Sequence, residues 1–183
     1  MTVAGLIEEK VEIPAGVKLK VEGTTVTVSG KNGQLSRDFA HPRVQISHRE
    51  KELVVSCEYP KVRDKAVVGT FVSHIENMIE GVTTGFEYHM KIVFSHFPMK
   101  ASVKGETFLI ENFLGEKAAR KARILGATKI NVKGNDVVLT GPDVEAVSQT
   151  AANIEHATKI KGYDPRVFQD GIYITVKAKK VSQ

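Results

Sequence analysis

Residues 159–180, KIKGYDPRVFQDGIYITVKAKK, bring cationic and aromatic side chains together in one short stretch. From residue 159 to the end of the chain six bases face two acids, so this stretch holds +4 of the net charge of +5. Such cations pair with phosphate oxygens, and aromatic rings stack on nucleic-acid bases. The candidates for these contacts are the cations Lys159, Lys161, Arg166, Lys177, Lys179 and Lys180 and the rings of Tyr163, Phe168 and Tyr173.

The same rings have a second interpretation, which is packing of the stretch against its own domain. Ile172, Ile174 and Val176 alternate with other residues as they do in a strand, and a disordered tail lacks such a pattern. We therefore expect the stretch to be ordered. Stacking on bases and packing on the domain both stay open for the rings.

A second basic run lies in NFLGEKAARKARILG, where Lys117, Arg120, Lys121 and Arg123 crowd together. Its two interpretations are the solvated face of a helix and contact with RNA. In a third cluster, SGKNGQLSRDF, Lys31 and Arg37 flank a tight hairpin turn at Lys31-Asn32-Gly33. Asn-Gly is typical of such turns because glycine adopts positive φ easily.

Enzymatic chemistry finds little support in the residue pattern. The six histidines are scattered, and none forms the i, i+4 pair that holds a metal on a helix. The glycines match neither a Walker loop nor a dinucleotide fingerprint. Cys57, in the apolar stretch ELVVSC, fits a small buried strand residue better than a reactive thiol. We therefore expect no catalytic residue, metal, cofactor or small-molecule substrate.

Length and composition describe a folded protein that buries a core. The chain has 183 residues, of which 42% are hydrophobic, and its single cysteine excludes an intramolecular disulfide. The first residues lack the apolar run of a signal peptide, and no stretch approaches the roughly 20 apolar residues of a membrane span. These features predict a cytoplasmic protein without a membrane partner.

An internal repeat organises these elements. Ile13-Pro14 in the first half matches Phe97-Pro98 in the second half, 84 residues later, and alternating strands follow both pairs. Each half then continues through two short strands into a helical pattern. The predicted fold class is α+β, with two tandem similar modules that each pack one helix on an antiparallel sheet. We place the modules at residues 1–82 and 83–183, with the basic extension in the second.

Two stretches carry the helical pattern. Apolar residues recur at helical spacing over residues 65–81, and Gly81 suggests where that helix ends. The second helix is predicted to follow Asp143, an acid placed to stabilise a helix N-terminus.

Four ordered motifs, SGKNGQLSRDFAH, IENMIEGVTTGFEYHMKIVFSHFP, IENFLGEK and PRVFQDGIY, extend over nearly the whole chain. Together they resemble the archaeal and eukaryotic form of the sixth protein of the large ribosomal subunit. That family has two similar α+β domains. The resemblance implies a structural role in translation, with binding to large-subunit ribosomal RNA chiefly through the second domain. The implied location is near the sarcin-ricin loop and the base of the factor-recruiting stalk, beside neighbouring ribosomal proteins.

The matching motifs also imply which residues contact RNA. They are Gly115, Glu116 and Lys117 in FLGEK, and Asp164, Arg166, Phe168, Gln169, Asp170, Gly171 and Tyr173 in the C-terminal motif. Two other readings of the chain remain: a module or chaperone that binds structured RNA outside the ribosome, and a small hydrolase that uses Cys57.

Overall fold

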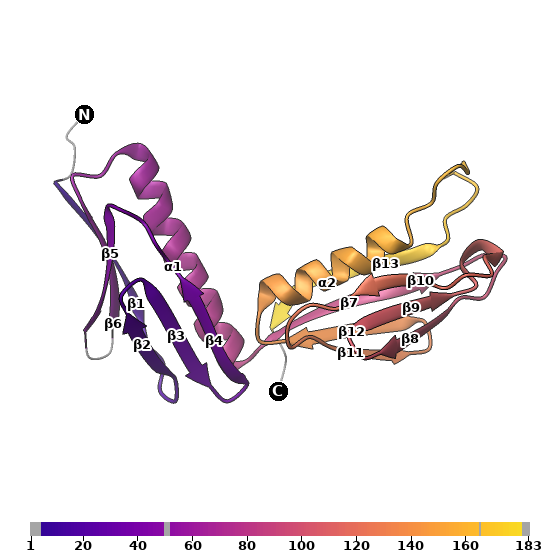
Figure 1. Ribbon diagram of the computed structural model, residues 1–183, viewed down its shortest axis with the longest axis horizontal. Coiled ribbons are helices and arrows are strands. Elements are labelled where there is room, and N and C mark those ends of the chain that lie inside the picture. Colours follow the sequence, from indigo (N-terminus) through magenta and orange to yellow (C-terminus); the bar gives the residue numbers. More distant parts are fainter. Residues whose placement is uncertain (1–4, 50–51, 165, 181–183) are drawn as a thin grey trace. The chain divides into compact units, whose positions relative to one another are not determined.

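The computed structural model describes residues 5–49, 52–164 and 166–180. It divides the chain into two compact units, Met1–Thr84 and Gly85–Gln183, which we call the first and the second module (Figure 1). The sequence suggests a boundary after residue 82, and the observed boundary lies two residues later, after Thr84. The difference arises because the helix that ends the first module continues to Thr83.

The described residues of the first module form two antiparallel sheets and one helix. Strands β1 (Leu6–Glu12), β6 (Glu52–Glu58) and β5 (Val44–Arg49) form one sheet in the order β1-β6-β5. Strands β2 (Lys18–Glu22), β3 (Thr25–Gly30) and β4 (Gly33–Asp38) form the other in the order β2-β3-β4. Helix α1 (Val62–Thr83) follows the last strand. The strands thus divide between two sheets, where we had expected one.

The second module repeats this arrangement. Strands β8 (Lys100–Lys104), β9 (Thr107–Glu111) and β10 (Arg120–Arg123) form a sheet like that of β2, β3 and β4. Strands β11 (Lys129–Lys133), β12 (Asp136–Gly141) and β7 (Phe86–Val93) correspond to β5, β6 and β1, and helix α2 (Val144–Ala157) follows. One further strand, β13 (Gly171–Lys180), pairs with the outer edge of β7. The predicted repeat of an α+β module is confirmed.

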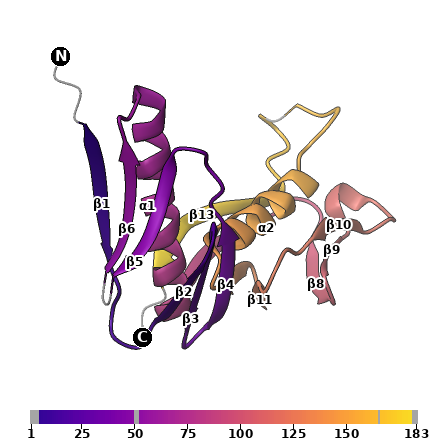
Figure 2. The same cartoon turned by 60° about the vertical axis from the view of Figure 1, so that its left-hand side comes forward.

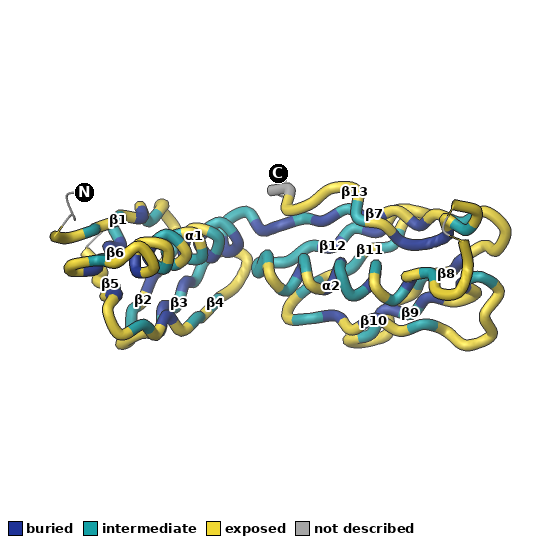
Figure 3. The backbone as a smooth tube through the Cα atoms, turned by 90° about the horizontal axis from the view of Figure 1, so that it is seen from above, coloured by how far each residue is buried: buried dark blue, intermediate teal, exposed yellow. Residues whose placement is uncertain are grey.

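Each module has a core of its own, as alternation along the strands requires. In β3 the side chains of Val26 and Val28 are fully buried, while those of Thr25 and Thr27 are partly exposed. Helix α1 adds Val68 and Ile75 to this core, and Ile154 of α2 is fully buried in the core of the second module. Burial follows these inner faces, whereas the loops are exposed (Figure 3).

Helix α1 is longer at both ends than the predicted residues 65–81. At its start the Asp64 carboxylate accepts a hydrogen bond from the Lys61 backbone N–H at 2.8 Å and pairs with Arg43 at 2.8 Å. Gly81 does not end the helix. Instead the β3–β4 turn covers the helix end, where Asn32 donates its backbone N–H to Val82 O at 3.0 Å and its side-chain amide to Thr83 O at 3.2 Å. These are last-turn carbonyls that lack partners within the helix.

Two other local predictions have different outcomes. Asp143 is confirmed at the start of α2, where its carboxylate accepts the Glu145 N–H at 2.9 Å. The helical interpretation of the basic run from Lys117 to Arg123 is wrong, because its second half is strand β10. The run alternates inward and outward, with Ala122 buried between the exposed Lys121 and Arg123, and a pairing with β9 completes the strand.

The approach of the β3–β4 hairpin to the end of α1 yields a prediction with a built-in control. A Cβ on Gly30 would lie 2.7 Å from Val82 O, whereas a Cβ on Gly69, within α1, would meet no atom within 4 Å. We expect Gly30→Ala to destabilise the protein by about 1–3 kcal/mol through overpacking. Gly69→Ala should stabilise it by about 0.5–1 kcal/mol, as expected for alanine in a helix. Urea denaturation measures both, and equal shifts would contradict the packing described.

Candidate nucleic-acid interface

Three loops meet at one end of the second module, which we call the loop end. They comprise residues 94–99, 112–119 and 159–170, of which residue 165 lies outside the described residues. The strand registers bring them together, since Gly171 lies opposite Val93 and Lys100 lies opposite Glu111. The end of β7, the start of β8, the end of β9 and the start of β13 therefore share one end of the module (Figure 1).

Arg120 joins two of these loops to helix α2. Its Nε and Nη2 donate to the two carboxylate oxygens of Glu116 at 2.8 and 2.6 Å. Its Nη1 donates to the backbone oxygens of Ala157 and Lys159 at 2.9 and 3.2 Å. The guanidinium also lies 4.1 Å from the centre of the Phe113 ring. A planar fork with five donors can make these contacts together, and a lysine cannot.

The same contact sets the charge state of Glu116. The hydrogen bond from Arg120, helped by its positive charge, holds the pKa of the Glu116 carboxyl below its ordinary value of 4.5. The carboxylate is therefore ionised under neutral conditions, and the pair is an ion pair with two parallel hydrogen bonds.

Asp170 ties the third loop to the first. Its side chain is buried at 1% exposure, and its Oδ1 accepts the backbone N–H of Ser95 at 3.1 Å. Its Oδ2 is buried without a partner among the described residues. Beside it, the buried Thr158 hydroxyl at the end of α2 accepts the backbone N–H of Ile172 at 3.1 Å. Asp170 thus lies inside the module and fixes where β13 begins.

The loop of residues 159–170 is also held by contacts within itself. Asp164 Oδ1 accepts the backbone N–H of Arg166 at 2.9 Å, which is an Asx turn. The rings of Tyr163 and Phe168 lie 4.9 Å apart, and Tyr163 keeps 55% of its surface exposed. The Tyr173 hydroxyl donates to Gln169 O at 3.2 Å. Packing therefore accounts for one side of these rings and leaves an exposed surface on Tyr163 and Tyr173.

Gly115 lies where the second loop meets the first. Its φ is +77°, and a Cβ there would come within 3.2 Å of the Phe97 ring. The neighbouring Asn112 also has positive φ, and its side-chain amide donates to Pro98 O at 3.1 Å. Glycine allows both the turn and the close approach of the two loops.

The predicted cations divide into groups in different places. Lys117, Lys159, Lys161 and Arg166 are exposed at the loop end. Lys121 and Arg123 face outward from β10. Lys177 is exposed near the other end of β13, because Lys180 lies opposite Phe86 at the start of β7. The start of β7 lies about 23 Å from the loop end, since the eight-residue strand rises roughly 3.3 Å per residue. The side chains of Lys179 and Lys180 lie outside the described residues.

Two further bases lie outside the clusters predicted from the sequence. Lys100 and Lys104 lie on β8, and the register puts Lys104, Thr107 and Arg123 in one row across the sheet. Phe108, next to Thr107 on β9, is buried, so Thr107 and the residues in its row project from the opposite, outer face of the β8-β9-β10 sheet. Their spacing of four residues within an alternating stretch was the available signal for a shared face.

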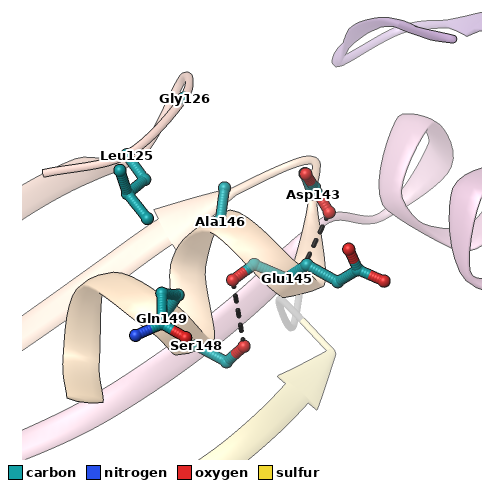
Figure 4. A pocket seen from close by; sticks show the side chains of 7 residues that line it. All are labelled: Leu125, Gly126, Asp143, Glu145, Ala146, Ser148 and Gln149. Atoms are coloured by element: carbon teal, nitrogen blue, oxygen red, sulfur yellow. Dashed lines mark hydrogen bonds between the residues drawn. The ribbon is translucent and has the colours of Figure 1, made fainter. Parts of the chain in front are cut away.

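A cavity of about 580 Å³ lies at the start of α2, lined by Leu125, Gly126, Asp143, Glu145, Ala146, Ser148 and Gln149 (Figure 4). Along helix α2, its last lining residue, Gln149, lies about 12 Å from Ala157, which Arg120 contacts, at 1.5 Å per residue. Its two carboxylates do not suit an anionic ligand, and the carboxylate of Asp143 caps the helix. The cavity is therefore separate from the loop end.

The alternative of a hydrolase that uses Cys57 is wrong. Cys57 is 1% exposed in β6 and packs in the first core, with its Sγ 3.7 Å from the backbone oxygen of Glu58. Among the described residues there is also no group of three or more His, Cys, Asp or Glu side chains that could hold a metal ion. Across the same residues, neither helix has the length and apolar character needed to span a membrane.

Comparison with known proteins agrees with the repeat. The family model described as ribosomal protein L6 matches the chain twice, at residues 13–85 and 97–171, and the two matches begin 84 residues apart. The chain is 52% identical to the large ribosomal subunit protein uL6 of Methanobrevibacter smithii, over 97% of this chain and 99% of the relative. It is 49% identical to uL6 of Methanococcus vannielii, over 99% of this chain and 100% of the relative.

A third relative gives a similar value. Identity to uL6 of Aeropyrum pernix is 51%, over 92% of this chain and 93% of the relative. One family model matches the chain twice, and the relatives are 49–52% identical to it over nearly the full length. The chain belongs to the ribosomal protein L6 family, a family of structural, non-enzymatic ribosomal proteins.

Proposed function

We propose that this protein is a structural component of the large ribosomal subunit whose second module binds large-subunit ribosomal RNA. The RNA-binding surface is the loop end together with the outer face of the β8-β9-β10 sheet. Within the cytoplasmic ribosome, this surface lies near the sarcin-ricin loop and the base of the factor-recruiting stalk. Neighbouring ribosomal proteins contact the rest of the molecule.

The proposal rests on the acidic side chains at the loop end, which are all held by hydrogen bonds inside the module. The described part of the loop end holds three carboxylates, and each is committed to a hydrogen bond inside the module. Glu116 binds Arg120, Asp164 binds its own loop, and Asp170 is buried against Ser95. The four exposed cations of the loop end, Lys117, Lys159, Lys161 and Arg166, therefore face solvent around carboxylates that already have partners. This arrangement favours a polyanion.

A comparison of equivalent faces supports the choice of the second module. The outer face of β2-β3-β4 carries the bases Lys18 and Lys20 and the acids Glu22 and Asp38, so it is neutral. The outer face of β8-β9-β10 carries four bases, Lys100, Lys104, Lys121 and Arg123, against the single acid Glu111. The same fold thus presents a positive face only in the second module.

The proposed surface would recognise RNA mainly by its shape and charge. Lysines on a sheet face and on loops neutralise phosphates and release counterions, which provides affinity without reading sequence. The major groove of an A-form helix is too deep and narrow for side chains to read. Selectivity therefore comes from the fixed spacing of the cations against a folded RNA, together with the exposed rings of Tyr163 and Tyr173.

We predict that Lys117→Gln, Lys159→Gln and Lys161→Gln together weaken binding to a large-subunit RNA fragment. Each lost phosphate contact should reduce the slope of log affinity against log salt by about 0.7–0.9. The matched control replaces Lys18, Lys20 and Lys65 of the first module with glutamine, which removes the same charge. Affinity at several salt concentrations measures the effect, and equal losses from the two triple variants would contradict the proposed surface.

A second prediction concerns Arg120, which we assign a positioning role because its donors already bind protein acceptors. Arg120→Gln should lower RNA affinity, since the loops lose their link to α2, but it should leave the salt slope unchanged. A reduced slope would show instead that Arg120 contacts a phosphate directly. Amide exchange of residues 112–119 in the free protein provides a second readout and should become faster in this variant.

The Glu116–Arg120 pair also predicts a pH dependence. Because the folded-state pKa of Glu116 lies below its ordinary value of 4.5, the pair's contribution to stability is present above that value. It is lost as the pH falls through the lower, folded-state pKa. An NMR titration should give a Glu116 midpoint below 4.5 in the wild type and a higher one in Arg120→Gln. Identical midpoints would mean that Arg120 does not hold this carboxylate in solution.

A further inference from the structure

The two modules differ at one sheet edge. In the second module β7 pairs with β12 on one side and with β13 on the other. In the first module β1 takes the place of β7 and pairs with β6. Among the described residues no strand lies on the other side of β1, which forms the outer edge of its sheet (Figure 2).

Strand β13 demonstrates what this edge of the fold accepts. It runs antiparallel to β7 over the whole length of that strand, from Gly171 opposite Val93 to Lys180 opposite Phe86. It also contributes a fully buried side chain, Ile172, and a partly buried one, Ile174, to the core. An added strand therefore supplies both backbone hydrogen bonds and apolar side chains at this position.

The free edge of β1 has a distinct chemistry on each face. Ile7 and Val11 point toward the core and α1, with Ile7 only partly buried. On the solvent face lie Leu6, Glu8, Lys10 and Glu12, all exposed. Counting Glu9, the strand has three carboxylates and one lysine, so a strand beside it meets a negative field.

Exposed apolar side chains extend this edge at the start of β1. In the described part of the first module, three large hydrophobic side chains are exposed: Leu6 at 50%, Tyr59 at 73% and Val62 at 90%. They lie at one end of the module, since Leu6 is opposite Glu58 and the Tyr59 N–H binds Gly5 O at 2.9 Å. Such a cluster beside an open edge is typical of a protein contact.

We propose that β1 pairs with an extended segment of a neighbouring protein, which runs antiparallel to β1 as β13 does to β7. Alternate residues of the segment are apolar and pack beside Ile7 and Val11. The residues between them are lysines or arginines beside Glu8 and Glu12. An aliphatic or aromatic residue of the same segment covers Leu6, Tyr59 and Val62.

The observations disfavour two other occupants. A second copy paired through β1 would bring together two strands that each carry three carboxylates and one lysine, and an excess of like charge disfavours a strand pair. RNA would place its phosphates beside these carboxylates. This proposal concerns the first module and a protein partner, so it is tested independently of the RNA surface of the second module.

The first experiment places a photoreactive residue, p-benzoylphenylalanine, at position 8 of the full chain in purified large subunits. The control carries it at position 76, on the exposed face of α1. We expect position 8 to crosslink to one peptide of another protein, in which apolar and basic residues alternate. Crosslinks to RNA, to a second copy of this chain, to a peptide without that pattern, or to nothing would each overturn the proposal.

The second experiment measures the backbone itself. Amides of residues 6–12 that point away from β6 should exchange at least tenfold more slowly in large subunits than in the free chain. Glu8→Lys with Glu12→Lys should remove this protection, whereas Glu76→Lys with Glu106→Lys, an equal charge change at exposed sites, should keep it. Unfolding of each free variant checks that the fold is intact. Equal exchange in the free and assembled wild-type chain would refute strand addition at β1.

Discussion

The structure of the loop end depends on the guanidinium of Arg120. Helix α2 ends in backbone oxygens that no further helical turn satisfies, and Arg120 supplies donors to Ala157 O and Lys159 O while it holds Glu116. Three irregular loops carry a large entropic cost when they are ordered. A single side chain that joins a helix end, a strand and a loop offsets part of that cost. The exposed cations can then keep a fixed spacing before RNA arrives, which reduces the entropy lost on binding.

The duplicated fold separates what is needed for stability from what is needed for binding. Both modules bury alternate residues of two sheets beneath one helix, and each keeps its own core. Their outer surfaces differ, since one three-stranded sheet is neutral and the other is basic. They also differ at one sheet edge, because β13 covers the edge of β7 while no strand among the described residues covers that of β1. We therefore propose that function lies in outward-facing residues and added segments on a shared scaffold.

Patterns local to the chain predicted the fold well. The Ile13-Pro14 and Phe97-Pro98 pairs, the alternation after them and the cap at Asp143 each depend on neighbouring residues. The site was harder, because its geometry comes from pairing between distant strands. Arg120 belongs to a basic run, yet its donors turn inward to α2. The cations of residues 159–180 form one cluster in the sequence, but β13 carries Lys177 away from Lys159. Lys100 and Lys104 join Lys121 and Arg123 only across the sheet.

The central claim is that RNA contacts the loop end and the basic sheet face of the second module. Ultraviolet crosslinking of intact large subunits, followed by mass spectrometry of RNA-linked peptides from this chain, tests it most directly. We expect linked peptides that cover residues 94–123 and 159–173, with Lys117, Lys161 or Tyr163 among the modified positions. Crosslinks confined to residues 5–84, with none from the second module, would contradict it.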